Sequence, residues 1–449
     1  MQGGKVVFVF LSLVLCGVHG TLHECGEFNT QRTKFEDYFN VFENSNNQNI
    51  NEVFKLMENI SNYNAKHTFL SDAPIKYVPD RIKAEGYPVE VHEIFTDDGY
   101  ILEMHRIPHG NLAQTDQTRR PPVLLVHAFL QSSSDWTILG AKNSLAYLLA
   151  DTNYDCWMLN VRGTEVSQRH TRYNPNGRGE KEYWNFSWHE MGMYDVAAAI
   201  DYILNETKFE KLNYIGYSQG SIAFLILTSM KPEYNNKIIE GNLVAPASYL
   251  KGTTNLFYQS FAKSYRSIKL MARFKHKLIF NNEAFLKIGL TACKNIVNST
   301  PKQCMLILNV LNSNQVNCST LPLILVGTPS GALSMRLSLH YLQSIRNGGF
   351  RQFDYENKRM NEKVYGRDTP PEYDLAKITA PINIFHSKDD DTSIYSNVIQ
   401  LQSQLPNVKS RYVVPIVDFG HVDFLYSRYA RNGLYNKLIS TINKANWNN

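Results

Sequence analysis

A serine between two glycines, placed where an expected strand meets an expected helix, constrains the fold of this chain most. Residues 212–227 read LNYIGYSQGSIAFLIL. The first residues of this stretch have β-forming side chains, and the apolar run 221–230 is long enough for a buried helix. Gly216 and Gly220 would let the backbone turn sharply around Ser218. This order predicts a nucleophile elbow with Ser218 as the nucleophile, although the motif also arises by chance and an ordinary turn is the alternative.

The segments on either side alternate between expected strands and expected helices. PPVLLVHAF (121–129) and YDCWMLNV (154–161) are continuous apolar runs, typical of strands that are buried on both faces of a parallel sheet. Two alternating runs around the Asp-Asp-Gly of residues 97–99 predict a hairpin. Helices are expected near residues 143–150 and 191–204. This rhythm predicts an α/β fold with a mostly parallel central sheet.

The rhythm is interrupted and then resumes. Residues 248–371 are expected to be largely helical, and strands return in APINIFHS (380–387) and SRYVVPIV (410–417). We therefore expect an inserted α-helical cap at 248–371, between a first core part at 80–247 and a second core part at 372–449. Residues 21–79 are polar and Asn-rich and form a variable N-terminal extension, for which a propeptide is one interpretation.

The first twenty residues have the pattern of a secretory signal peptide. Lys5 precedes an apolar core from Val6 to Val18, and small residues up to Gly20 fit a cleavage site. This apolar core is too short to span a bilayer comfortably, so a membrane anchor is the less favoured alternative. No other segment approaches a spanning length. We expect a secreted protein, with the lysosome as the alternative location.

Composition agrees with a folded protein in an oxidising compartment. The chain has 46 basic and 41 acidic residues, a balance too mild to argue for nucleic-acid binding. After Cys16 leaves with the signal peptide, five cysteines remain, and this odd count leaves at least one thiol free or paired between chains. Cys156 lies in an expected buried strand and is interpreted as a structural thiol. Five N-x-S/T sequons are expected glycosylation sites: Asn59, Asn185, Asn205, Asn298 and Asn317.

Ser218 needs a base to take its proton, and the base needs an acid to orient it. In the expected fold these follow the serine in the order acid and then histidine, each on a loop after a core strand. Residues 389–391 are three aspartates after one such strand, and His421 follows the next. Taken alone, the aspartates would be interpreted as a solvated turn. His127 is an alternative base, but it precedes the serine and ends a strand, so a structural role is favoured. One oxyanion donor is expected at the backbone N–H of Gln219, and the other in the loop that begins at residue 127.

Several collinear stretches resemble the acid lipase family, which comprises the gastric and lysosomal acid lipases and their insect relatives. The resemblance covers roughly residues 82–443 and implies the α/β-hydrolase fold. The stretches that carry it are GYPVEVHEIFTDDGYILEMHRIP, HAFLQSSSDW, NSLAYLLADTNYDCWMLNVRG, YWNFSWHEMGMYDVAAAIDYI, NYIGYSQGS, GTPSGA and FGHVDFLY.

The resemblance implies a function and a role for particular residues. It implies a lipase that cleaves long-chain acyl esters such as triacylglycerols at a micelle or droplet surface, without a metal or organic cofactor. The implied catalytic residues are Ser218, Asp390 and His421, and the implied oxyanion donors are the N–H groups of Phe129 and Gln219. The implied cap disulfide joins Cys293 to Cys304; Cys318 has no counterpart, and a bridge to Cys25 is conceivable.

Four departures from the family pattern concern rate, pH optimum and substrate preference more than the reaction type. The family usually has His-Gly-Leu-Leu where residues 127–130 read His-Ala-Phe-Leu. It usually has His at the position of Tyr217, Gly at that of Leu159 and His at that of Gly327. Ala128 adds a methyl group beside the oxyanion loop, which motivates a non-catalytic lipid-binding or storage protein as a rival function. A short-chain esterase, a cholesteryl esterase and a peptidase on the same fold are further alternatives.

Overall fold

The computed structural model describes residues 77–111, 119–279, 308, 313, 315–317, 320–327 and 331–447. The expected signal peptide, nearly all of the N-terminal extension, Cys25, Cys293, Cys304, Cys318, Asn59 and Asn298 lie outside these residues. No helix in the described ranges is long and apolar enough to cross a membrane.

The molecule is built on a mixed sheet that is mostly parallel, as the sequence predicts. The strands run in the order β1-β2-β4-β3-β6-β7-β10-β11, and the short β5 pairs with β2. β1 and β2 form the predicted antiparallel hairpin, and every pair from β4 to β11 is parallel. The strands are β1 Glu90–Phe95, β2 Tyr100–Ile107, β3 Pro122–Val126, β4 Asp155–Leu159, β5 Arg169–His170, β6 Leu212–Tyr217, β7 Ile238–Val244, β10 Ile382–His386 and β11 Val408–Val413.

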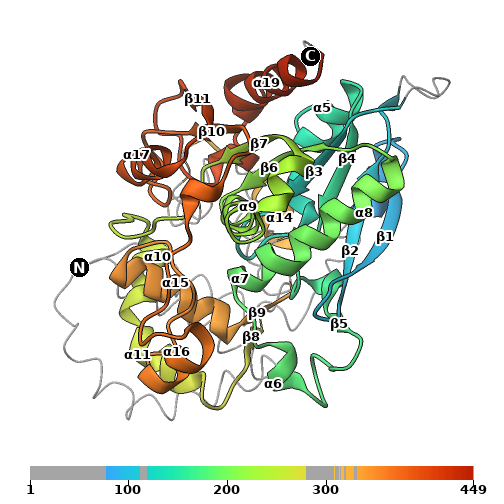
Figure 1. Cartoon of the computed structure of the whole chain (residues 1–449). Helices are drawn as coiled ribbons and strands as arrows, with labels where there is room; N and C mark the ends of the chain where they lie inside the picture. The colour runs from blue at the N-terminus through green and yellow to red at the C-terminus, as the bar shows by residue number, and fades with distance from the viewer. Residues whose placement is uncertain are drawn as a thin grey trace, which may run out of the picture.

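Helices cover the sheet. Figure 1 shows α8 and α9 in front of the strands and α5 and α19 together at the top. The helices of the core are α4 Val78–Ala84, α5 Leu145–Asp151, α6 Glu180–Tyr183, α7 Trp188–Glu190, α8 Ala197–Thr207, α9 Gln219–Met230, α17 Tyr395–Gln404, α18 Asp423–Tyr426 and α19 Asn436–Trp447.

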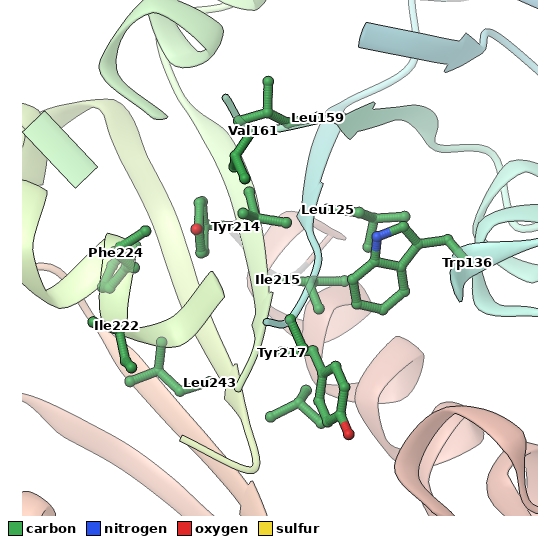
Figure 2. Close-up of a cluster of buried hydrophobic side chains, with 14 of the residues drawn as sticks. Leu125, Trp136, Leu159, Val161, Tyr214, Ile215, Tyr217, Ile222, Phe224 and Leu243 are labelled. Atoms are coloured by element: carbon green, nitrogen blue, oxygen red, sulfur yellow. The ribbon is translucent and has the colours of Figure 1, made fainter. Parts of the chain in front are cut away.

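The central strands are buried along their whole length, which explains their continuous apolar sequences. Every residue of β3, β4 and β6 is buried. Side chains from these strands pack against α9, with Tyr214 beside Phe224 at 4.8 Å between ring centroids, as Figure 2 shows. Cys156 lies in β4 as a buried free thiol, as expected.

The order of the strands reverses direction at β3, within the sheet. The chain passes from β3 to β4 on one side and then returns to add β6 on the other side of β3. This reversal is a topological switch point, where loops after adjacent strands separate and leave a crevice at the carboxyl ends. The loop that begins at His127 follows β3, and Ser218 follows β6 directly.

A π-helical turn replaces the first part of the regular helix predicted at 191–204. It spans Met191–Val196 and continues into α8. Asp195 lies in this turn and accepts hydrogen bonds from the backbone N–H of Arg162 at 2.9 Å and from its Nε at 2.8 Å. Arg162 also pairs with Asp98 of the β1–β2 hairpin at 2.6 Å. Local helical periodicity reveals neither the widened turn nor this buried ionic contact.

Between β7 and β10 the chain leaves the sheet. We call residues 248–371 the cap segment; Figure 1 shows its helices α10, α11, α15 and α16 grouped below the sheet, at the opposite end from α19. The described part of this segment contains helices and also a two-stranded antiparallel sheet that the sequence did not predict, because each of its strands has only three residues. Its elements are α10 Leu256–Lys263, α11 Tyr265–Met271, β8 Lys277–Ile279, α14 Leu321–Gly327, β9 Ala332–Ser334, α15 Met335–Asn347 and α16 Lys358–Tyr365.

Candidate active site

Ser218 lies on a sharp turn between β6 and α9. Its φ and ψ angles are 51° and −106°, a backbone conformation that costs energy for a residue with a Cβ. A Cβ on Gly220 would lie 2.1 Å from the carbonyl oxygen of Val126 in β3. A Cβ on Gly216 would lie 2.5 Å from the backbone of Gly220. The two glycines therefore allow α9 to approach the sheet closely, and the turn leaves the Ser218 side chain at the end of β6.

A continuous chain of hydrogen bonds joins Ser218, His421 and Asp390. His421 Nε2 lies 2.9 Å from Ser218 Oγ. His421 Nδ1 lies 2.8 Å from Asp390 Oδ2 and 3.0 Å from Oδ1. All three side chains are buried, and they come from the loops after β6, β10 and β11. When Nδ1–H donates to the carboxylate, Nε2 is free to accept the proton of the serine hydroxyl.

The three neighbouring aspartates have different environments. Asp390 Oδ1 accepts the backbone N–H groups of Thr392 and Ser393, both at 2.8 Å, so the carboxylate that contacts His421 is held firmly. Asp389 is exposed and accepts the N–H of Asp418 at 2.9 Å. Asp391 is buried and accepts a hydrogen bond from the Asn255 side chain at 2.8 Å. Only Asp390 reaches His421 among these three, a distinction that the sequence left open.

The charges around His421 favour its protonated form. Burial by itself lowers the pKa of His421, but the adjacent Asp390 carboxylate, its hydrogen bond and the nearby Asp391 together raise the pKa above its usual range. Burial also raises the pKa of Asp391 to about 6, and the neighbouring Asp390 adds to this shift. These carboxylates therefore stabilise the positive charge of the His421 imidazole after it receives a proton.

Two backbone N–H groups, one after β3 and one after β6, have no hydrogen-bond acceptor within the described ranges. They belong to Phe129, in the loop after β3, and to Gln219, the first residue of α9. Both residues are buried, and they come from the two strands that flank the switch point. Buried donors without partners are uncommon. These are the two groups that the resemblance assigned to the oxyanion.

An aromatic cluster, formed by Phe129, Tyr258 and Tyr341, connects this site to the cap segment. The Phe129 ring packs on that of Tyr341 in α15 at 4.2 Å between centroids, and Tyr258 in α10 lies 6.4 Å from Phe129. The Tyr341 hydroxyl also donates to Gln219 Oε1 at 3.0 Å. Sequence reasoning missed both tyrosines, because nothing in the residues of the insertion indicates which of its side chains turn toward the sheet.

His127, the alternative base, is separate from the hydrogen-bonded chain. Its Nδ1 lies 2.8 Å from the carbonyl oxygen of Ala128, and its Nε2 accepts the N–H of Val161 at 3.2 Å. Burial lowers its pKa to about 4, with the Ala128 carbonyl partly opposing that shift. A neutral imidazole therefore links the loop after β3 to the residues after β4.

Comparisons with known proteins agree with this geometry. The model of a partial α/β-hydrolase lipase region matches residues 78–140, and that of the α/β-hydrolase fold matches residues 121–239. The chain is 36% identical over 371 residues to Lipase 3 of Drosophila melanogaster, covering 82% of this chain and 92% of that protein. It is 32% identical over 371 residues to gastric triacylglycerol lipase of Bos taurus, covering 81% and 90%. The chain belongs to the acid lipase family.

A solved structure shows the same fold at greater distance. A putative lipase from Sulfolobus solfataricus matches with a TM-score of 0.52 at 14% identity, covering 79% of this chain and 94% of that one. Together with the family models, this establishes an α/β-hydrolase fold. The relatives establish the chain as a carboxylic ester hydrolase of the lipase type.

The tyrosine that stands where the family usually has histidine contacts the backbone of the loop after β11. The Tyr217 hydroxyl donates to the carbonyl oxygen of His421 at 2.6 Å, and its ring stacks on the imidazole at 5.3 Å and an interplanar angle of 28°. Tyr217 is fully buried. It therefore restrains His421 through two contacts. Among the other departures, Ala128, Phe129 and Leu159 are all buried.

Proposed function

We propose that the protein is a lipase that hydrolyses long-chain acyl esters, most readily triacylglycerols, through a Ser218–His421–Asp390 triad. The observation that carries this proposal is the hydrogen-bonded chain from Ser218 through His421 to Asp390, on three loops at one edge of the sheet. The curated relatives include gastric triacylglycerol lipases, which supports the same substrate class.

The proposed reaction has two halves. Ser218 Oγ attacks the ester carbonyl carbon while its proton passes to His421 Nε2, and the carbonyl oxygen becomes an oxyanion that accepts the N–H groups of Phe129 and Gln219. The tetrahedral intermediate then collapses, and the leaving alcohol takes the proton from Nε2. In the second half, water attacks the acyl-enzyme and gives its proton to His421. The fatty acid leaves as that proton returns to Ser218 Oγ.

The surroundings of Ser218 support an apolar acyl group. Phe129, which offers one of the two proposed N–H donors, also has an aromatic ring that packs in the cluster with Tyr258 and Tyr341. Apolar and aromatic linings with a few directed polar groups are typical of sites for lipid-like ligands. Asp390 contributes by keeping Nδ1 of His421 protonated and by stabilising the imidazolium.

The test compares the glycosylated wild-type protein with Ser218→Ala. Fatty-acid release is followed from emulsified triolein and from a soluble butyrate ester. We expect serine-dependent release from both, with a preference for triolein. Release from butyrate alone would make the protein a short-chain esterase. If the wild-type protein released no more than Ser218→Ala from either ester and still bound lipid, the lipid-binding or storage function would replace this proposal.

We also propose that the chain is secreted and glycosylated, with the lysosome as the alternative location. The N-terminal signal pattern supports this, and Asn185, Asn205 and Asn317 are exposed. Enzymatic removal of N-glycans from protein recovered from the medium of expressing cells should increase its electrophoretic mobility. Protein found only inside the cells, without a mobility shift, would contradict the proposal.

A further inference from the structure

The cap segment carries more excess positive charge than the whole protein does, because the rest of the chain is net acidic. Residues 248–371 contain seventeen Lys and Arg against five Asp and Glu, whereas the rest of the chain contains 29 and 36. Between Gly252 and Phe353 the only acidic residue is Glu283. The net charge of the whole chain is therefore small because a basic cap segment is balanced in part by a mildly acidic remainder. Such an asymmetry attracts anionic partners to one end of the molecule.

The helix α11 and the turn after it display these charges next to apolar side chains. Arg266 and Arg273 are exposed and form no ion pair with any described residue. Leu270 and Phe274 are 55% and 76% exposed, although large apolar side chains are usually buried. Exposed cations alternating with exposed apolar groups are typical of a helix that lies in a lipid–water interface.

The neighbouring helix α16 repeats this composition. Met360 and Val364 are exposed one helical turn apart, and Arg359 and Lys363 are exposed beside them. Glu356, just before α16, accepts hydrogen bonds from Tyr265 and Lys269 of α11, so the two helices lie side by side, as Figure 1 also shows. We call the exposed basic and apolar side chains of α11, its following turn and α16 the basic–apolar face.

We propose that the basic–apolar face binds the protein to lipid surfaces that carry anionic phospholipid headgroups. The charges complement the headgroups, and the apolar side chains would enter the boundary between headgroups and acyl chains. A nucleic acid or another soluble polyanion would pair with the cations but would leave Leu270, Phe274, Met360 and Val364 in water. The combination of both kinds of side chain therefore favours a lipid surface.

This face lies one helix away from the candidate active site. Arg346 of α15 stacks on Tyr265 of α11 at 4.1 Å, and Tyr341 of the same α15 reaches Gln219 beside Ser218. A lipid surface bound to α11 would therefore be separated from the site by α15. The inference deepens the proposed lipase function, since it assigns a docking surface to the enzyme, but binding itself does not require turnover.

The test measures binding to vesicles in the Ser218→Ala background, which prevents hydrolysis of the lipid by the proposed triad. Co-flotation is measured with phosphatidylcholine vesicles and with vesicles that also contain phosphatidylserine. The charge variant is Arg266→Gln with Arg273→Gln, and the apolar variant is Leu270→Ser with Phe274→Ser. The matched control is Lys211→Gln with Lys409→Gln, because both lysines are exposed and lie at the amino ends of β6 and β11, away from the cap segment.

We expect binding to the anionic vesicles to exceed binding to neutral ones and to weaken in high salt. The charge variant should lower partitioning onto anionic vesicles roughly thirtyfold. The apolar variant should also lower it, and the control should not. Equal binding to both kinds of vesicle, or unchanged binding by both cap variants, would overturn the inference. Loss with the charge variant alone, accompanied by heparin binding of the parent protein, would replace the lipid surface by a soluble polyanion.

A second readout separates this inference from the proposed function. With Ser218 restored, every variant should hydrolyse the soluble butyrate ester at the wild-type rate, because none of these residues contacts the candidate triad. Vesicle binding without any serine-dependent ester hydrolysis would leave this inference standing and would reject the lipase function. Serine-dependent hydrolysis without vesicle binding would reject this inference and leave the lipase function standing.

Discussion

The sheet core and the cap segment differ in how they use polar groups. In the core, several charged side chains are buried and hydrogen-bonded, as Asp390 and His421 are to each other and Asp195 is to Arg162. On the cap segment, cations such as Arg266 and Arg273 are exposed without an ion pair to any described residue. Buried charges fix a geometry, whereas free charges remain available to a partner. This difference supports our proposals that the core carries out the ester chemistry and that the cap segment attaches to a lipid surface.

The two regions meet closely beside the serine. Tyr341 of α15 contacts both Phe129 and Gln219, the residues whose N–H groups are the proposed oxyanion donors. At this contact the roles of the core and the cap segment are therefore not fully separate. Substitutions in the core, in the cap segment and at this contact should therefore have effects of different size.

Asp390→Asn should show that the core alone determines the chemistry. An amide at this position no longer selects the Nδ1–H tautomer of His421, and losses of about ten thousand-fold in kcat are typical of this change. The measurement is kcat on the soluble butyrate ester. Asp389→Asn is the matched control, since its exposed carboxylate contacts Asp418 and not His421. Similar losses in both variants would show that the neighbourhood, not the triad contact, is responsible.

Gly220→Ala should test how tightly the core is packed at the elbow. The added methyl group would lie 2.1 Å from the Val126 carbonyl oxygen, so α9 must move away from the sheet, which we expect to cost about 3 kcal/mol of unfolding free energy. Gly366→Ala in the cap segment is the comparison. Its φ is 70° but no atom lies within 4 Å, so only the backbone penalty of about 1 kcal/mol is expected. Denaturant unfolding measures both, and equal costs would contradict the prediction.

Tyr341→Phe tests the contact between the two regions. Loss of the hydroxyl leaves buried Gln219 Oε1 without its donor, which we expect to lower the unfolding free energy by about 1 kcal/mol. Because Gln219 also carries a proposed oxyanion donor, kcat should fall severalfold with little change in KM. Tyr365→Phe is the control, since its hydroxyl donates to the Phe353 carbonyl at 2.7 Å within the cap segment. It should lose similar stability and keep its kcat.

Asp391→Asn should have the smallest effect, a shift of the pH profile. Catalysis needs neutral His421, so activity is lost as the pH falls through the pKa of this residue. The negative charge of Asp391 helps to raise the pKa of His421, so replacing this carboxylate by a neutral amide should lower that pKa. The acidic limb of kcat/KM on the butyrate ester should therefore move to lower pH. A shift to higher pH would contradict the assigned direction.

The fold could be predicted from the sequence in most of its elements because their signals are local. The apolar runs that became β3 and β4 are buried on both faces, and this burial is what makes a strand continuously apolar. The π-helical turn at Met191–Val196 was missed because apolar periodicity predicts a helix without distinguishing a π-helical turn from an α-helical one. The two-stranded sheet of the cap segment was missed because three-residue strands have no readable period.

The sequence by itself determined the elements, their order and the candidate residues Ser218 and His421, since these follow from periodicity, turn chemistry and chain order. The residue pattern alone did not distinguish Asp390 from its neighbours, although the family resemblance pointed to it; the tertiary structure shows the contact, a distance of 2.8 Å between loops 31 positions apart. It also revealed Tyr341 beside Gln219 and brought α11 next to α16. Contacts between distant segments decide these features, and a linear pattern carries no information about which side chains a folded surface brings together.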